Sequence, residues 1–270
     1  CNTDARVVPC IEVINGWYGR KDIPVGAPKG YSAPRLTTSM LRTDWPGYLV
    51  SHFAHATDST ACAPSAVETY RRVLSRQPDG SVTICTLGFF SNLKALLAST
   101  PDRWSKLSGK DLVAKKVKLL VSMAGAFPNG YEFNVYWDAD AARTVADEWP
   151  TPIIFSGWEI GSEIFTGNAV RDLPGDISAN PIKAAYTLAL SEDDRPHGRD
   201  SWDQTAALVA IRGAAPWFTL RHGHMTVDGK GNNKWTDDPQ GQHAYLVFAQ
   251  PIKQVRDAIE ALMTQMPRKR

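Results

Sequence analysis

Residues 117–123 read Val117-Lys118-Leu119-Leu120-Val121-Ser122-Met123, an apolar run whose length and bounds are typical of a buried strand. A helical pattern follows from Ala139 to Trp149, and Pro152 to Ser156 forms the next apolar run. Strand, helix and strand in this order predict a parallel pair joined by a crossover helix, the unit from which α/β sheets are built. Ligands of open α/β sheets bind beyond the carboxyl ends of the strands, where Gly125 to Asn134 and Gly157 to Glu159 fall.

The same alternation extends toward the N-terminus. Pro64 to Arg76 has apolar residues at helical spacing and a proline in its first turn, which predicts a helix. Val82 to Leu87 predicts a buried strand, and Ser91 or Asn92 can cap a helix that runs to Leu97. We therefore expect an open, mostly parallel, Rossmann-like sheet flanked by helices.

The last third of the chain has a different pattern. Trp217 to Val227, Lys234 to Thr236 and His243 to Phe248 predict antiparallel strands, with Asp228-Gly229 as the hairpin signal. An amphipathic helix from Pro251 to Met266 closes the chain. The strands carry three histidines that could suggest a metal, but solvent-facing or hydrogen-bonded strand residues are the better interpretation, because no Cys, Asp or Glu stands at ligand spacing. These residues are His222, His224 and His243.

Composition excludes several classes of protein. The 270 residues are 43% hydrophobic and 21% charged, enough for a substantial core. A net charge of +2 argues against a nucleic-acid surface, the only basic run being Arg268-Lys269-Arg270, and no apolar run approaches the roughly 20 residues that span a bilayer. Nine tryptophans and 18 prolines favour an exported protein over a cytoplasmic one, while a homo-oligomeric assembly is left open.

Tyr131-Glu132-Phe133-Asn134 places a carboxylate and an amide just ahead of a predicted helix. In an extended segment Glu132 and Asn134 would share one side, with Phe133 on the other. A glutamate accepts hydrogen bonds and an asparagine amide both donates and accepts, so the pair can hold the hydroxyls of a sugar. A strand end with surface polar residues, leading into an Asp-capped helix, explains the same four residues without a ligand.

This segment and its continuation, Val135-Tyr136-Trp137-Asp138-Ala139-Asp140-Ala141-Ala142, resemble the Glu-Phe-Asn and Asp-x-Glu-Ala-Ala signature of the inosine/uridine-preferring nucleoside hydrolases. Members of that family cleave the bond between ribose and a base. Gly19-Arg20-Lys21-Asp22-Ile23-Pro24-Val25 is similar to the family's Gly-Arg-x-Asp-Ile-Pro-Val, and Asn2 to an asparagine ahead of it.

Three later segments resemble the family in the same order, so that the agreement covers roughly residues 2 to 210. Thr86-Leu87-Gly88-Phe89-Phe90-Ser91-Asn92 is similar to Thr-Gly-Pro-Leu-Thr-Asn, and Met123-Ala124-Gly125 to Met-Gly-Gly. Trp202-Asp203-Gln204-Thr205-Ala206 is similar to His-Asp-x-x-Ala.

The resemblance implies roles for particular residues. Ribose hydroxyls would be held by Glu132 and Asn134, with Asn129 and Asn2 as further contacts. Calcium, which prefers oxygen ligands, would be held by the Asp203 carboxylate and the backbone carbonyl of Leu87. Trp158 and Trp202 are candidates to stack on a base or sugar ring.

Two departures from the family change these expectations. The family's Asp-rich loop, Asp-x-Asp-x-x-x-Asp-Asp, would lie ahead of Cys1, and with it most metal ligands and the catalytic base. We therefore expect residues 1–270 to form one nucleoside-hydrolase-like domain that lacks its first strand and metal loop. Trp202 stands where some members carry a histidine that protonates the leaving base, a role that an indole cannot fill.

Asp203 also has a purely structural interpretation. Ser201-Trp202-Asp203-Gln204 has the Ser-x-x-Gln pattern of a capping box, and an aspartate in the first turn of a helix is favourable to the helix dipole. Pattern alone favours this interpretation, whereas the family resemblance favours a metal ligand.

The sequence thus predicts a hydrolase that cleaves the N-glycosidic bond of a ribonucleoside or related glycoside by a metal-activated water. The expected partner is a small molecule, with neither nucleic acid nor membrane involved. The alternative is a non-catalytic sugar- or nucleoside-binding protein that keeps the hydroxyl contacts but lacks metal and base. A structural or interaction domain that uses only the fold is the third interpretation.

Overall fold

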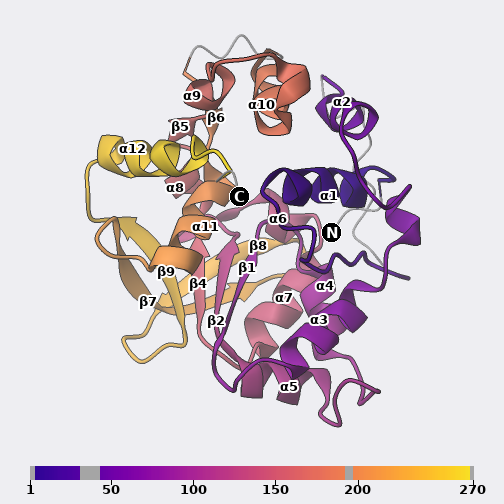
Figure 1. The fold of residues 1–270 in the computed structure, drawn as a ribbon. Coiled ribbons are helices and arrows are strands. Elements are labelled where there is room, and N and C mark those ends of the chain that lie inside the picture. Colours follow the sequence, from indigo (N-terminus) through magenta and orange to yellow (C-terminus); the bar gives the residue numbers. More distant parts are fainter. Residues whose placement is uncertain (1–3, 31–42, 192–196, 268–270) are drawn as a thin grey trace.

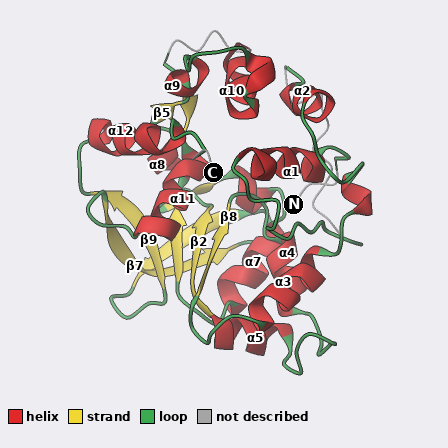
Figure 2. Cartoon of the chain, viewed as in Figure 1, coloured by secondary structure: helices red, strands yellow, loops and turns green. Residues whose placement is uncertain are grey.

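A computed structural model of the protein describes residues 4–30, 43–191 and 197–267, so the predicted site residue Asn2 lies outside the described part. Figures 1 and 2 show a central sheet with helices around it. The helices are α1 (Val7–Trp17), α2 (Trp45–His52), α3 (Ala66–Ser75), α4 (Ser91–Leu97), α5 (Gly109–Lys116), α6 (Phe133–Tyr136), α7 (Ala139–Glu148), α8 (Trp158–Gly161), α9 (Asn168–Arg171), α10 (Pro181–Ser191), α11 (Trp202–Arg212) and α12 (Ile252–Met263). The strands are β1 (Val82–Thr86), β2 (Val117–Met123), β3 (Asn129–Tyr131), β4 (Ile153–Ser156), β5 (Phe165–Thr166), β6 (Arg199–Asp200), β7 (Phe218–Val227), β8 (Asn232–Asp237) and β9 (His243–Phe248).

Seven strands form one sheet in the order β1-β2-β4-β9-β7-β8-β3, and β5 and β6 form a small antiparallel pair. The first four strands pair in parallel, whereas β7, β8 and β3 add to β9 in antiparallel orientation. The predicted α/β class, with a parallel sheet between helices and an antiparallel hairpin near the C-terminus, is confirmed. The hairpin β7-β8 continues the main sheet through β9.

The sheet has a hydrophobic core on each face. Along β2, Leu120 packs into the core formed with α4, α5 and α7, while its neighbour Val121 packs into the core formed with α11 and α12. Successive side chains of a strand point to opposite faces, which is why one apolar run serves both cores. This double burial explains the continuous apolar sequence from which the strand was predicted.

A third group of helices lies beyond the carboxyl ends of the parallel strands (Figure 1). Helices α1, α2 and α10 pack together around Cys10, Leu49 and Ala184, a cluster separate from the two cores of the sheet. This group faces the point where α6 and α11 begin. It therefore forms a cover over the end of the sheet at which a ligand is expected.

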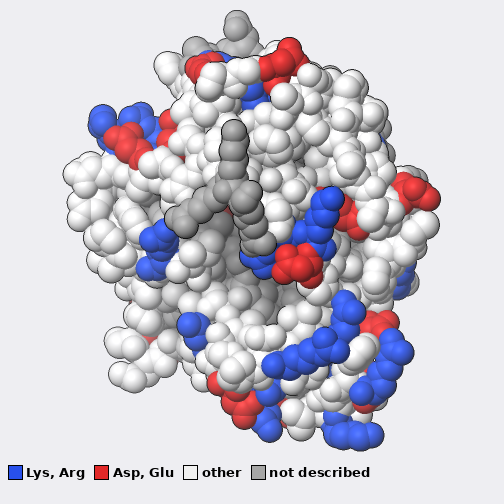
Figure 3. Space-filling view, viewed as in Figure 1, with Lys and Arg blue, Asp and Glu red and all other residues white. Residues whose placement is uncertain are grey.

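Basic side chains gather on the lower right of the molecule in Figure 3, over the region of α3 and α5, with acidic side chains among them. Arg72, Arg76 and Arg103 surround the Trp104 indole, with guanidinium carbons 4.8–5.9 Å from the ring centroid. Folding brings these three arginines together from separate segments, so that a basic cluster forms in addition to the C-terminal basic run of the sequence. Among the described helices, none is long and apolar enough to cross a membrane.

Candidate functional site

Glu132 directly follows β3 and caps α6, and its carboxylate reaches back to Gly125, just beyond the carboxyl end of β2. Its Oε1 accepts a hydrogen bond from the Asn134 backbone N–H (2.9 Å), and its Oε2 accepts one from the Gly125 backbone N–H (3.1 Å). Gly125 has a φ of +81°, a conformation that favours glycine and that aims its N–H at the carboxylate. The side chain is 4% exposed, and burial raises the pKa of Glu132 to about 7 although both hydrogen bonds oppose that shift.

Asn134 converges on the same strand end. Its Nδ2 donates to the Met123 carbonyl oxygen at 3.0 Å, while its Oδ1 has no hydrogen bond within the described residues. The predicted extended segment is wrong, since Phe133 to Tyr136 form a helical turn and both polar side chains are buried. Their shared direction is nevertheless observed, because the two side chains meet at Met123 and Gly125.

Asp203 is in the first turn of α11, which packs over β1 and β2. The predicted capping box does not form. Ser201 shares its hydroxyl with Thr166 at 2.6 Å, and Gln204 Nε2 donates to the Tyr186 hydroxyl at 3.2 Å. The Asp203 carboxylate thus has no capping partner and lies at a pocket wall. The residue is exposed to the pocket, yet desolvation by the protein around it raises its pKa to about 6 against the opposing charge of Arg199.

A close approach of α8 and α11 fixes where α11 begins. A Cβ on Gly161 would lie 2.4 Å from the Trp202 Cα, so only glycine permits this spacing. The Ser201 N–H donates to the Gly161 carbonyl, and the Trp202 indole N–H donates to the Trp158 carbonyl at 3.0 Å. Thr205 adds a buried hydroxyl contact to Ser156 of β4 at 2.7 Å. The Trp202 ring and the Asp203 backbone are therefore held rigidly against the end of the sheet.

Asp203 and Trp202 line a pocket of about 410 Å³ between α1, α10 and α11. This size lies within the range of small-molecule sites. The carboxylates of Glu132 and Asp203 are close enough that the charge of Asp203 contributes to the raised pKa of Glu132. The described residues of the pocket wall are Ile14, Trp45, Ile182, Ala185, Tyr186, Ala189, Arg199, Asp200, Trp202, Asp203 and Gln204.

The remaining predicted site residues lie in several places. Leu87 directly follows β1 and is 46% exposed, and Trp158 begins α8 and is 50% exposed. Asn129 belongs to β3, and its Oδ1 accepts a hydrogen bond from the Trp235 backbone N–H at 3.2 Å. The side-chain carbonyl of Asn129 is thus engaged with β8.

Tyr186 and Arg199 are pocket residues that sequence reasoning missed. Tyr186 comes from α10, and burial raises the pKa of its phenol above the ordinary value. Arg199 begins β6, and its charge lowers the pKa of both Asp203 and Tyr186. Gln204 belongs to the Ser-x-x-Gln pattern, which predicts a helix cap and not a pocket residue. No local pattern marks these residues, because the pocket joins segments that are distant in the sequence.

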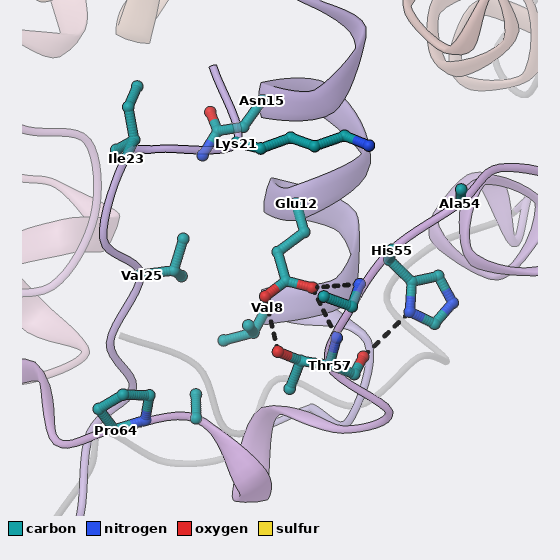
Figure 4. Close-up of a pocket in the computed structure, with 12 residues that line it drawn as sticks. Val8, Glu12, Asn15, Lys21, Ile23, Val25, Ala54, His55, Thr57 and Pro64 are labelled. Carbon is teal, nitrogen blue, oxygen red and sulfur yellow. Dashed lines mark hydrogen bonds between the residues drawn. The ribbon is translucent and has the colours of Figure 1, made fainter. Parts of the chain in front are cut away.

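A second pocket, of about 240 Å³, lies on another side of α1 around Glu12 (Figure 4). Glu12 accepts hydrogen bonds from the Thr57 hydroxyl (2.6 Å) and from the backbone N–H groups of Thr57 (2.7 Å) and Ala56 (2.9 Å). Burial opposes ionisation, but these bonds outweigh it and lower the pKa of Glu12. This carboxylate ties α1 to the segment after α2, and its role is structural.

The histidines of the C-terminal strands have hydrogen-bonded or exposed positions. His243 is buried, and its Nδ1 accepts the Met225 backbone N–H at 3.0 Å. Desolvation lowers the pKa of His243 to about 4. His224 contacts Asp238 through Nε2 at 3.0 Å. In residues 4–30, 43–191 and 197–267, no group of three His, Cys, Asp or Glu side chains could hold a metal ion.

Comparison with known proteins relates the chain to a family. A family model described as inosine-uridine preferring nucleoside hydrolase matches residues 10–249. An uncharacterized protein of Schizosaccharomyces pombe is 28% identical over 201 residues, which cover 67% of this chain and 58% of that relative. The chain thus spans less than two thirds of the length of the curated relative that it matches.

Solved structures share the fold. A plant nucleoside hydrolase has 19% sequence identity and a TM-score of 0.71, with 96% of this chain and 88% of that one covered. A purine-preferring ribonucleoside hydrolase from Gardnerella vaginalis has 16% identity and a TM-score of 0.69, with 96% and 85% covered. The type III effector protein XopQ, complexed with adenosine diphosphate ribose, has 14% identity and a TM-score of 0.65, with 95% and 79% covered.

The raised pKa of Glu132 predicts a pH dependence of stability. Between the ordinary value of 4.5 and about 7 the folded state binds more protons than the unfolded state, so the free energy of unfolding falls as pH rises. A shift of this size corresponds to on the order of 3 kcal/mol. Urea unfolding at pH 5 and pH 8, with chelator present, should show that Glu132→Gln removes this part of the decrease. An identical pH dependence in the variant and the natural protein would show that Glu132 titrates normally.

The spacing at Gly161 predicts a large effect of one methyl group. Gly161→Ala should lower the free energy of unfolding by about 1–3 kcal/mol, because the α11 backbone must move away. Gly229→Ala is a matched control, since a Cβ there meets nothing within 4 Å. Equal midpoints for the two variants in denaturant unfolding would contradict the close packing of α8 and α11.

Proposed function

Because the chain belongs to the inosine-uridine preferring nucleoside hydrolase family, we propose that the protein hydrolyses the N-glycosidic bond of a ribonucleoside. The observation that carries this proposal is that Glu132 and Asn134 meet just beyond β2, near enough to Asp203 to feel its charge, while Asp203 lines a pocket of about 410 Å³. Carboxylates and an amide at this position fit a sugar with several hydroxyls.

Glu132 and Asn134 are proposed to hold the ribose. Each Glu132 oxygen accepts one backbone N–H, which leaves a lone pair on each for a sugar hydroxyl. The Asn134 Oδ1 is open in the same way, while its Nδ2 is fixed on Met123. These groups are oriented before the substrate arrives, so little entropy is lost when hydroxyls replace water.

The chemistry follows from the charge that develops on the sugar. As the bond between C1′ and the base breaks, positive charge builds on the ribose ring, and nearby carboxylates stabilise it more strongly than they stabilise the ground state. Glu132 and Asp203 supply negative charge at this end of the sheet. Trp202, with its indole N–H held by Trp158, offers a fixed ring face to the base.

Calcium is proposed as the metal. The Asp203 carboxylate, without a hydrogen bond in the described part of the chain, and the Leu87 carbonyl at the end of β1 are oxygen donors of the kind that calcium prefers. They fit part of a calcium site. A bound calcium ion would polarise the attacking water. Further ligands and the general base are proposed to come from an Asp-rich loop ahead of Cys1.

A nucleoside- or sugar-binding protein is the second candidate function. The similarity in fold to an effector protein complexed with adenosine diphosphate ribose favours it, because that structure is of a complex with a ribose-containing ligand. The two candidates separate experimentally, since a binder retains affinity for ribosides and releases no base.

The enzyme proposal predicts calcium-dependent stability and activity. In the full natural chain, calcium at 100 times its Kd should add about 2.7 kcal/mol to the free energy of unfolding, and chelation should reverse the gain. Asp203→Asn should abolish both this gain and the release of base from inosine and uridine. Asp147→Asn, an exposed change in α7, should preserve both. Base release that persists in Asp203→Asn would contradict the metal role, and no release by the natural protein would favour the binder.

A further inference from the structure

One wall of the pocket, here called the aglycone wall, is formed by Tyr186, Arg199, Trp202 and Gln204. The charges of the pocket as a whole are unequal in number. Arg199 is the single cation among the described residues that line the pocket, while Asp200 and Asp203 are acidic. No ion pair joins the Arg199 guanidinium to a described residue. An exposed guanidinium on a pocket wall, without an ion pair in the described part of the chain, is available to a ligand.

The aglycone wall offers no strong acid to a leaving base. The Trp202 indole N–H does not ionise as an acid and is already donated to the Trp158 carbonyl. Burial raises the pKa of the Tyr186 phenol, whose oxygen already accepts a hydrogen bond from Gln204. A base that leaves through this wall must therefore be stabilised by something other than proton transfer from it.

We propose that Arg199 stabilises the departing base as an anion, and that the protein accordingly selects ribosides whose leaving group is acidic. This inference rests on the proposed N-glycosidic hydrolysis and names the substrate class and a catalytic residue for it. The guanidinium supplies a charge-assisted donor for the nitrogen or exocyclic oxygen on which negative charge develops.

The reaction is balanced without an acid in the wall. The bond between C1′ and the base breaks with both electrons remaining on the base, and the oxygen of water forms the new bond to C1′. The proton of water passes to the general base, the carboxylate proposed above to come from an Asp-rich loop ahead of Cys1. The expelled anion takes a proton from solvent after release. Arg199 keeps its proton throughout, because guanidinium remains charged at any working pH.

The backbone holds Arg199 in the required place. Thr166 pairs with it across β5 and β6, and only two residues separate it from Trp202. Arg199 lines the same pocket as Tyr186 of α10 and Asp203 of α11, and its charge acts on both of these residues. The side chain of Arg199 is itself exposed and free to follow a ligand.

The test is a leaving-group series with the full chain. We would measure kcat/KM for 4-nitrophenyl riboside, xanthosine, inosine and uridine, whose leaving groups differ in acidity. Arg199→Gln should reduce kcat/KM about tenfold or more for inosine and uridine, because a charge-assisted hydrogen bond is lost. The loss for the nitrophenyl riboside should be below about threefold, since nitrophenolate needs little stabilisation. For inosine and uridine, kcat/KM of Arg199→Lys should lie between the values of the natural protein and of Arg199→Gln.

The controls separate this role from a structural one. Arg212→Gln, at the exposed end of α11, should leave every rate unchanged. If Arg199 only supports Asp203, Arg199→Gln will lower all four rates by the same factor, and that result overturns the inference while the hydrolase function stands. Unchanged rates would overturn it equally. Natural protein that cleaves none of the four ribosides overturns the proposed function, and this inference with it.

Discussion

The carboxylate of Glu132, held between the backbone N–H groups of Gly125 and Asn134, is the contact on which the site depends. It joins the end of β2 to the start of α6 at a point where the chain turns through a glycine with positive φ. A buried carboxylate is costly unless hydrogen bonds satisfy it, and here burial prevails, raising its pKa to about 7. Burial of the Glu132 carboxylate therefore lowers the stability of the fold, and it does so where a sugar could use the remaining lone pairs. This pattern is expected of a functional residue.

The start of α11 is set by a second constraint of a different kind. Gly161 allows α8 and α11 to touch, and three contacts then fix the first turn, from the Ser201 N–H, the Trp202 indole and the Thr205 hydroxyl. Asp203 gains no partner from this arrangement. The three contacts fix the backbone from which the Asp203 carboxylate extends, while the carboxylate itself stays exposed and open to a ligand.

Much of the fold could be predicted because its local signals agree with its packing. The strand at 117–123 was predicted to the residue, since an apolar run buried on both faces has clear ends. Helix α5 was not predicted, because its Lys-rich sequence hides its two buried apolar side chains, Leu112 and Val113. The capping box at Ser201 failed for a long-range reason, as Thr166 competes for the hydroxyl. Arg199 and Tyr186 could not be found at all, because only the tertiary fold brings β6 and α10 to α11.

The charges around the pocket also impose a condition on any bond-breaking chemistry. Carboxylates that favour a positive ribose disfavour a negative leaving group nearby, and in a site shielded from water this repulsion is larger than in solution. A wall with a histidine would solve the problem by proton transfer, leaving a neutral base. A tryptophan at that position provides only a polarisable surface. The repulsion must then be offset by a positive charge on the same wall, and Arg199, which lines the same pocket as Asp203 and Tyr186, satisfies that electrostatic requirement.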